Sequence, residues 1–296
     1  MGMRTLALYR LLLVPITIAL LWLPNLAAKP RVAILDFGET ATGKRVADEL
    51  HGSFMATGLF TLLDRALVRS AAKGIGYAGS LNMSLDEARD LGAAIGCDFF
   101  IIGDAQTLRR SPSSGTYFES YASIFIVNAQ TGELLFWDRP DLQASTPSEA
   151  EKELLKELDR RAAHYASLIE RAHAAKLMRA PDRSDSDEGE DFLVLPDEDA
   201  PDARHFSPPQ PYRRLQPNYP EEAARAEAEA TVDALVWIGT DGEVKKVKIV
   251  RWAGFGLDEA VSEIIRKMHF RPALRDGAPV NVRVLLRYNF RRRPND

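Results

Sequence analysis

An acidic, proline-containing segment divides this chain into two parts and constrains its fold more than any other feature. Residues 181–203 carry ten aspartates and glutamates against one arginine, a net charge of −9, and the run Ser-Pro-Pro-Gln-Pro follows at 207–211. A segment of this composition cannot bury enough apolar surface to offset the entropy lost on ordering, and its like charges extend it. We therefore expect a disordered, acidic, proline-rich linker over residues 181–211, with a folded domain on each side.

The two flanking parts have the composition of folded domains. With 296 residues, 46% of them apolar, the chain has the size and apolar content of about two domains with buried cores. Residues 29–180 have a net charge of −2, and residues 212–296 have a net charge of +4. The overall charge of −4 argues against a general nucleic-acid binder. The single cysteine, Cys97, excludes an internal disulfide.

The first 28 residues have the order of a secretory signal. Arg4 and Arg10 precede an apolar run from Leu11 to Leu23, and two alanines follow at the end of the segment. This run is shorter than the ~20 residues that a membrane-spanning helix needs. We therefore expect a cleaved signal peptide over residues 1–28 and a periplasmic protein. The alternative is an uncleaved anchor in the inner membrane with the remainder facing the periplasm, and only then do we expect membrane association.

Residues 29–180 show a mixed pattern of strands and helices. Apolar runs predict buried strands at 31–37 and 97–107, and a hairpin is expected around the turn 129–132. Two Ser-x-x-Glu capping boxes, at Ser84 and Ser148, predict the starts of two helices. This order indicates an α+β domain built around one sheet.

One segment of this domain resembles a phosphate-binding loop. Gly38 to Gly43 lies between a predicted strand and a predicted helix, and a lysine follows. The next residue is Arg45, where a working loop needs a serine or threonine hydroxyl for magnesium. We therefore interpret the segment as a glycine-bounded structural turn.

Four stretches of this domain together suggest a family. They are Val32-Ala-Ile-Leu-Asp-Phe37, Val46-Ala-Asp-Glu-Leu50, Gly58-Leu-Phe-Thr-Leu-Leu-Asp-Arg65 and Gly96-Cys-Asp-Phe-Phe-Ile-Ile-Gly103. Over about residues 31–140 the pattern resembles periplasmic domains of the CsgG and TolB N-terminal type. The resemblance implies a scaffold or assembly role in the envelope and carries over no catalytic group.

Residues 212–296 have the pattern of a ββαβ unit. Alternating apolar residues predict strands at 231–238 and 244–250, joined by the tight turn Thr240-Asp-Gly242. A helix is expected over 257–268, and a last strand over 280–290. The whole chain is therefore predicted to be α+β, with two small α+β domains joined by the linker.

The second domain resembles the C-terminal domain of TonB-family proteins. The matching residues are Tyr219-Pro220, Val232, Asp241-Gly242, Val244, Val247, Gly254, Leu257-Asp258, Ala260, Phe270, Pro272-Ala273, Gly277, Pro279-Val280 and Phe290. They span essentially all of residues 212–292. The sequence departs from the family pattern at Ala230 (usually Gly), at Trp252-Ala253 (often Ser-Ser) and at His269 (often Trp).

The resemblance implies that the domain binds a partner by strand addition. TonB-type domains capture an extended segment of an outer-membrane transporter, and an edge strand supplies the backbone groups for such a contact. The partner-binding residues implied by position are Gln216, Pro217, Tyr219, Pro220, Val282, Val284, Leu286 and Tyr288. Two structural alternatives stay open. Tyr219 and Pro220 could simply fasten the chain to the first strand, and the edge could be paired within a homodimer.

No pattern of catalytic residues or metal ligands stands out. The five histidines are scattered, and no Gly-x-Ser-x-Gly elbow occurs. Asp36, Asp64, Asp98 and Asp104 border predicted strands, where turn and capping roles are the common ones. We predict no enzyme activity, no cofactor and no metal site.

The function predicted from the sequence is a non-catalytic interaction protein of the periplasm and cell envelope. Its expected partner is an extended segment of an envelope or outer-membrane protein. The alternative is a membrane-anchored, TonB-type energy transducer for outer-membrane transport.

Two expectations concern the linker itself. The apolar island Phe192–Leu195 is interpreted as an anchor that packs on one domain, with a partner-binding motif as the alternative. The acidic linker is also a candidate to dock on the basic second domain, although the sequence does not define the surface.

Overall fold

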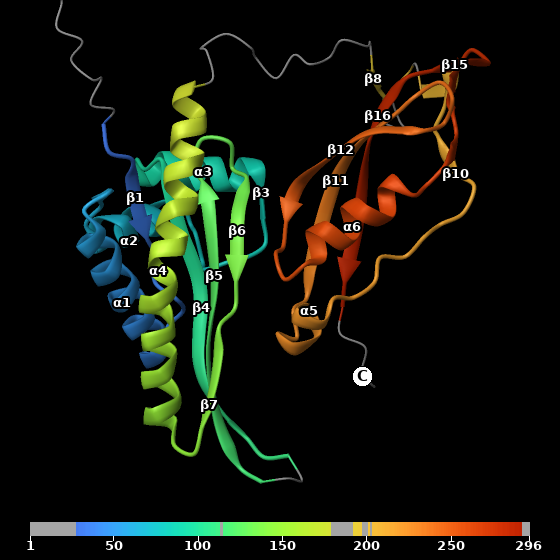
Figure 1. Cartoon of the computed structure of the whole chain (residues 1–296). Helices are drawn as coiled ribbons and strands as arrows, with labels where there is room; N and C mark the ends of the chain where they lie inside the picture. The colour runs from blue at the N-terminus through green and yellow to red at the C-terminus, as the bar shows by residue number, and fades with distance from the viewer. Residues whose placement is uncertain (1–27, 113–114, 179–191, 197–200, 202, 292–296) are drawn as a thin grey trace, which may run out of the picture.

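The computed structural model describes residues 28–112, 115–178, 192–196, 201 and 203–291. The chain has a mixed α+β fold with two parts, each built around a sheet (Figure 1). The predicted signal peptide lies outside the described residues except for its last residue, and so does most of the acidic part of the predicted linker.

The first part contains a six-stranded sheet. Its order is β2-β1-β4-β5-β6, and β7 pairs with the other half of β5. Strand β1 is parallel to both of its neighbours, whereas β5 is antiparallel to β4, β6 and β7. The strands are β1 (Arg31–Ile34), β2 (Thr61–Leu62), β4 (Phe99–Arg110), β5 (Tyr117–Asn128), β6 (Leu134–Asp138) and β7 (Asp141–Ala144).

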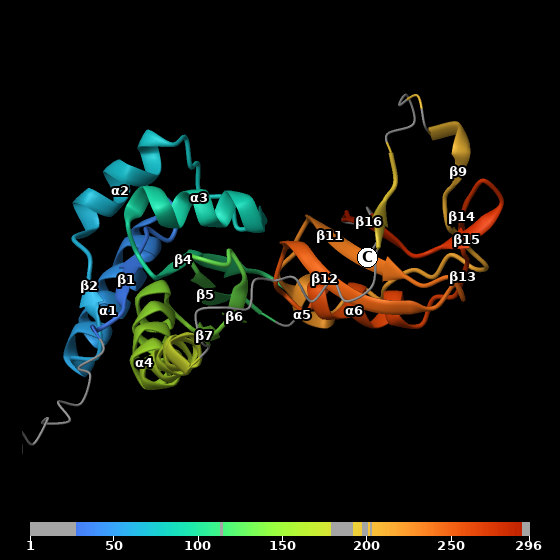
Figure 2. The same ribbon diagram turned by 90° about the horizontal axis from the view of Figure 1, so that it is seen from above.

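Helices cover both faces of this sheet. Helices α1 (Ala41–Thr57) and α4 (Pro147–Met178) lie on one face, and α2 (Arg65–Gly74) and α3 (Leu85–Ile95) lie on the other (Figure 2). Alternation along the strands supplies both cores. Ile101 and Ile124 face α1 and α4, whereas Phe100 and Phe125 belong to the core on the opposite face.

The helix starts test the two predicted capping boxes. The box at Ser84 is confirmed, because its side chain accepts from the N–H of Glu87 and the Glu87 side chain accepts from the N–H of Ser84. The box at Ser148 is wrong by two residues. The hydroxyl of Thr146 accepts from the N–H of Glu149, and Pro147 opens the helix, where a missing N–H has no cost.

The second part contains a five-stranded sheet of order β3-β12-β11-β16-β8, in which β3 is Met83–Ser84 and β8 is Leu193–Val194. Its centre is the predicted ββαβ unit, with β11 antiparallel to both β12 and β16. The elements are β12 (Val244–Trp252), β11 (Ala230–Ile238), β16 (Val282–Phe290), α5 (Glu221–Arg225) and α6 (Leu257–Arg266). Helix α6 packs on one face of this sheet (Figure 1).

Part of the predicted linker belongs to the second part. Strand β9 (Phe206–Ser207) pairs with β14 (Ala273–Arg275), which also pairs with β15 (Ala278–Val280). Strand β10 (Gln210–Pro211) pairs with β13 (Phe270–Arg271). The ordered second part therefore begins earlier than the predicted boundary at residue 212. Pro211 stands in a two-residue pairing at a sheet edge, where a missing N–H is tolerated, and Pro208 and Pro209 lie between the two short strands.

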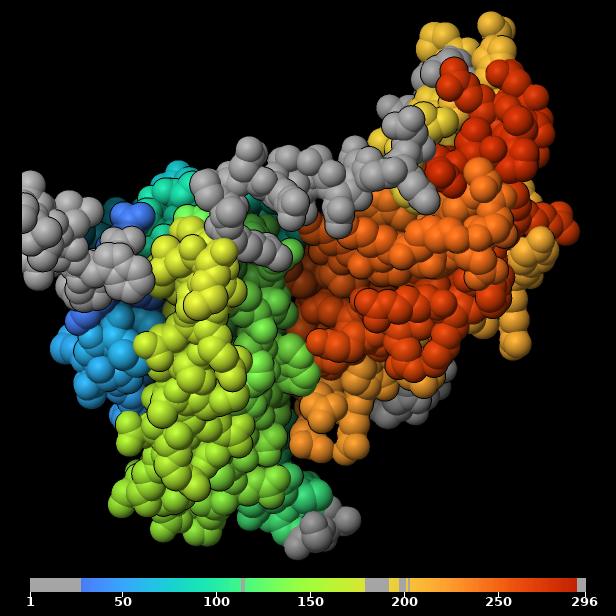
Figure 3. Space-filling view, turned by 45° about the horizontal axis from the view of Figure 1, so that its top comes forward, coloured from blue at the N-terminus to red at the C-terminus, as the bar shows by residue number. Residues whose placement is uncertain are grey.

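The two parts are joined by a shared core. The five-stranded sheet takes its first strand, β3 (Met83–Ser84), from the first part, where it immediately precedes α3. The amide of Asn82 donates to the C=O of Thr231 (2.8 Å) and of Trp252 (2.7 Å), and it accepts from the N–H of Thr231 (3.0 Å). Figure 3 shows the two parts in direct contact.

Aromatic packing continues this contact. Trp252 stacks on Phe125 of the first sheet with ring centroids 6.0 Å apart, and Phe255 meets the edge of the same ring at 5.4 Å. The indole N–H of Trp252 donates to the C=O of Gly132 (2.9 Å). The departure from the TonB pattern at Trp252 therefore lies at the contact between the two parts.

Candidate binding groove

The chain itself occupies one edge of the second sheet and part of the other. Strand β3 pairs with β12 at the first edge. At the opposite edge, β8 (Leu193–Val194) runs parallel to β16, in register with Val282 and Arg283 only. The apolar island of the linker is thus an anchor, as interpreted. Within the described residues, no strand pairs with residues 284–290 on this side of β16.

Along this open stretch, every second residue turns its backbone groups outward. The C=O of Asn281 accepts a hydrogen bond of 2.9 Å from the N–H of Leu193 in β8, so the backbone of Asn281 faces the edge. Since the hydrogen-bonding direction alternates along a strand, the backbone groups of Leu285, Arg287 and Asn289 face the same edge. An extended segment beside β16 would meet three N–H and three C=O groups.

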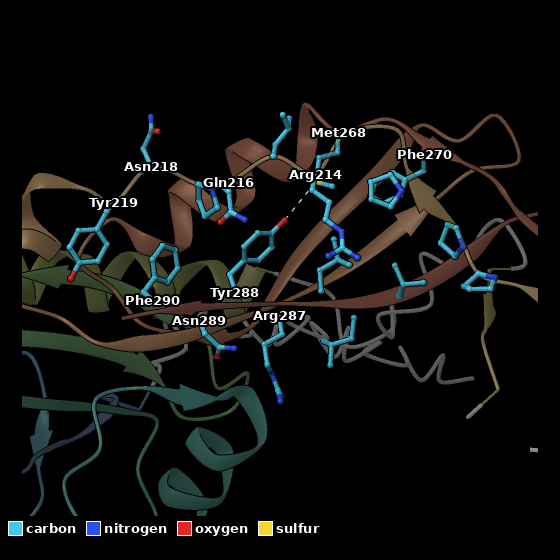
Figure 4. Close-up of a pocket in the computed structure, with 18 of the residues that line it drawn as sticks. Arg214, Gln216, Asn218, Tyr219, Met268, Phe270, Arg287, Tyr288, Asn289 and Phe290 are labelled. Atoms are coloured by element: carbon cyan, nitrogen blue, oxygen red, sulfur yellow. Dashed lines mark hydrogen bonds between the residues drawn. The ribbon is translucent and has the colours of Figure 1, made fainter. Parts of the chain in front are cut away.

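A groove of about 1650 Å³ follows this edge (Figure 4). One wall is β16 from Arg283 onward, and the other is the extended segment 208–219, with Met268 and Phe270 between them. In Figure 4, Tyr288 and Phe290 point from β16 toward the segment 208–219, whereas Arg287 points away from it. Val194 and Leu195 of the anchored island line the groove as well.

Six of the eight residues predicted from the sequence line this groove: Gln216, Pro217, Tyr219, Val284, Leu286 and Tyr288. The other two do not. Val282 is fully buried and its outward neighbour is Leu193, so its position on the edge is already filled. Pro220 precedes α5 and lies beside Gly256. The structure therefore places the two predicted segments on the walls of one groove, which β16 lines from Arg283 onward.

Tyr219 also fastens its own segment to the fold. Its hydroxyl donates to the C=O of Ala228 (2.8 Å), and its ring lies 6.1 Å from that of Phe290. Since 39% of Tyr219 is exposed, it both packs on the fold and presents a surface to the groove. Tyr288 is held at the hydroxyl by the sulfur of Met268 (3.6 Å), and burial raises its pKa.

The groove carries more positive than negative charge. Arg214, Arg283, Arg287 and Arg291 line it, against a single acidic residue, Glu227. Arg287 donates two hydrogen bonds to Asp233 (2.7 and 2.9 Å), which raise the pKa of its guanidinium. Met268, Phe270 and Arg214 were not predicted from the sequence as binding residues. Phe270 appeared only among the residues that match the family pattern.

The aspartates that border the first sheet do not assemble into a site. Asp36 accepts hydrogen bonds from Arg69 and Arg65, which lower its pKa. Asp64 caps α2, whereas Asp104 accepts from a tyrosine hydroxyl. Among the described residues, no group of three histidine, cysteine, aspartate or glutamate side chains is placed to hold a metal ion.

Two other residues considered from the sequence have structural surroundings. The predicted turn from Gly38 to Gly43 is shorter than expected, because α1 begins at Ala41 and includes Gly43; Arg45 lies in this helix and pairs with Glu151 of α4. Cys97 is buried, and this burial raises the pKa of its thiol to about 12. A thiol with such a pKa is a poor nucleophile near neutral pH.

The second part of the chain is a TonB C-terminal domain. Residues 215–291 match the family described as Gram-negative bacterial TonB protein C-terminal, which confirms the resemblance seen in the sequence. The resemblance of residues 31–140 to CsgG and TolB domains stays a prediction. No curated protein sequence is significantly similar to the chain.

Three of the solved structures that are similar to this chain illustrate the comparison. The TonB CTD of Pseudomonas aeruginosa is 21% identical, with a TM-score of 0.26. The match covers 36% of this chain and 100% of that chain. The hypothetical protein CT253 from Chlamydia trachomatis is 12% identical, with a TM-score of 0.34 over 47% and 98% of the two chains. Lipoprotein GNA1162 from Neisseria meningitidis is 11% identical, with a TM-score of 0.33 over 46% and 99%.

Of the helices described, none combines the length and the apolar character needed to cross a bilayer.

Proposed function

We propose that this protein is a non-catalytic interaction protein of the periplasm and cell envelope. Its TonB-type domain captures an extended segment of a protein partner by strand addition to β16. The observation that carries the proposal is the open stretch of β16 beside the groove. A guest strand there would pair with the outward backbone groups of Leu285, Arg287 and Asn289, while its alternate side chains enter the groove.

The lining of the groove indicates the kind of guest. Leu285 and Tyr219 offer exposed apolar surface, and the arginines outnumber the acidic residues. We therefore expect an extended segment of an envelope or outer-membrane protein, with apolar side chains at alternate positions and acidic residues near them. A second copy of the chain, pairing β16 with β16, is the alternative occupant.

Site-specific crosslinking in the envelope tests this proposal. A photo-reactive amino acid at Asn289 should crosslink to an extended segment that mass spectrometry maps to one partner. The same group at Lys245, an exposed residue of β12 away from this edge, is the positional control.

Two variants of Leu285 separate strand addition from simple proximity. Leu285→Pro removes an outward N–H and leaves the pairing with β11 intact, so the Asn289 crosslink should disappear. Leu285→Ala keeps the N–H and should keep the crosslink. A crosslink that survives Leu285→Pro in a folded protein would refute the proposal.

The energy-transducer alternative requires residues 1–28 to stay on the chain as an anchor. N-terminal sequencing of the exported protein distinguishes the two, because a start near Lys29 excludes the anchored form.

A further inference from the structure

The second sheet has a basic outer face on the side opposite α6. Pairing in the sheet places Trp237 between Lys246 and Arg283, and Asp233 between Arg251 and Arg287. Residues in register point to the same face. The intervening residues of β11, such as Val236, are instead buried in the core together with α6. We call this surface the basic face; it comprises Asp233, Leu235, Trp237, Lys246, Lys248, Arg251, Arg283, Leu285 and Arg287, of which Asp233 and Trp237 are buried.

Positive charge exceeds negative charge on the basic face. Arg287 contacts Asp233 at 2.7 Å, and Arg251 contacts Glu87 of α3 at 2.9 Å and Asp233 at 3.6 Å. The ammonium of Lys246 lies 5.1 Å from the centre of the Trp237 ring, and the guanidinium of Arg283 lies 6.0 Å from it. Such a surface attracts an anionic partner.

Strand β8 brings the acidic segment of the same chain to this surface. Val194 is in register with Arg283 and 62% exposed, so it lies on the basic face at its edge. Acidic residues flank β8 closely in the sequence. Glu188, Glu190 and Asp191 precede it, and Asp197, Glu198 and Asp199 follow it. Three to five extended residues reach roughly 10–17 Å. The distance from β16 across to β12 is two strand spacings, or about 10 Å.

We propose that the acidic segment 182–202 docks on the basic face of its own chain, with β8 as the anchor. Two independent observations support this occupant: the opposite charges of segment and face, and the fixed position of β8 between the acidic runs. The covalent link gives the segment a high effective concentration at the face, so an external anion competes poorly. Arg283 and Arg287 of the basic face also line the groove, so the docked segment and a guest strand would lie beside each other along β16.

A peptide-binding experiment with the mature chain, residues 29–296, tests the docking. In one variant, residues 182–202 are replaced by a glycine-serine linker of equal length. The probe is a fluorescein-labelled synthetic peptide of residues 182–202, and its matched control is the same peptide with every acidic residue changed to its amide. Fluorescence-anisotropy titrations at about 20 mM and about 500 mM NaCl then measure the affinity of each peptide, and the difference between the two salt concentrations gives the contribution of charge to binding.

The docking predicts that the native peptide binds the glycine-serine variant about ten-fold or more tightly than the neutral peptide does. This advantage should vanish at high salt, and it should also vanish when Lys246→Gln and Arg283→Gln are added. The wild-type chain should bind neither peptide appreciably. Equal binding of both peptides, no binding at low salt, or equal binding to wild type and variant would overturn the proposal. A wild-type dimer that dissociates on linker replacement would place the contact between copies and also overturn it.

Discussion

A single added carbon at Gly254 tests whether the two parts of the chain share one core. Gly254 has a φ of +70°, and a Cβ atom there would overlap Cε1 of Phe125 and lie 3.1 Å from its Cζ. The Phe125 ring is fully buried between Trp252 and Phe255, so it has no free space to move into. Gly254→Ala should therefore strain the contact between the parts.

The expected cost has two components. An alanine in the left-handed region costs about 1–2 kcal/mol, and overpacking a buried ring adds about 1–3 kcal/mol. The total loss in free energy of unfolding is therefore about 2–5 kcal/mol. The matched control is Gly277→Ala, which has a φ of +81° and no atom within 4 Å of the added carbon. It should lose only the backbone component of about 1–2 kcal/mol.

Urea unfolding of the mature chain, followed by tryptophan fluorescence, measures both variants. Trp252 packs against Phe125, and Trp137 packs against Phe255, so tryptophan fluorescence reports directly on the contact between the two parts. We expect Gly254→Ala to be less stable than Gly277→Ala by about 1–3 kcal/mol. Equal losses in the two variants would refute the shared core.

Three further predictions concern single residues. Asn82→Ala should lower the free energy of unfolding by about 2–3 kcal/mol, because it leaves buried backbone groups without partners, whereas Asn218→Ala on an exposed stretch should cost under about 0.5 kcal/mol in the same urea assay. Burial raises the pKa of Asp258 to about 7, so the folded state holds its proton more tightly than the unfolded state does. Stability should therefore fall as pH rises from about 4 to 7, and subtracting the profile of Asp258→Asn should reveal this fall; identical profiles would contradict it. Leu285→Pro should keep the thermal midpoint close to that of wild type, whereas Leu286→Pro should lower it strongly by breaking a bond to β11; similar midpoints would show that the edge is misassigned.

The local pattern of the second domain was predictable from the sequence, and so were the walls of its groove. Alternation and turn residues such as Gly242 mark the ββαβ order, and the family pattern places Tyr219 opposite the last strand. These features depend on neighbours in the sequence or on one repeated motif.

The contact between the two parts was not predictable in the same way. Strand β3 has two residues, too few to show a period of two, and the role of Asn82 depends on backbone groups far along the chain. Trp252 gave the one visible signal, because it departs from the family pattern, but its partner Phe125 lies in the other domain. The early pairing of β9 was missed because prolines and charge dominate the composition around it.

The central claim is that a guest strand pairs with the open stretch of β16. The most direct measurement is amide hydrogen exchange by NMR on the mature chain, with and without the segment that crosslinks to Asn289. The account predicts that exchange slows at Leu285, Arg287 and Asn289, while Leu286 and Tyr288, already paired with β11, change little. Unchanged exchange at those three outward amides in the saturated complex would contradict it.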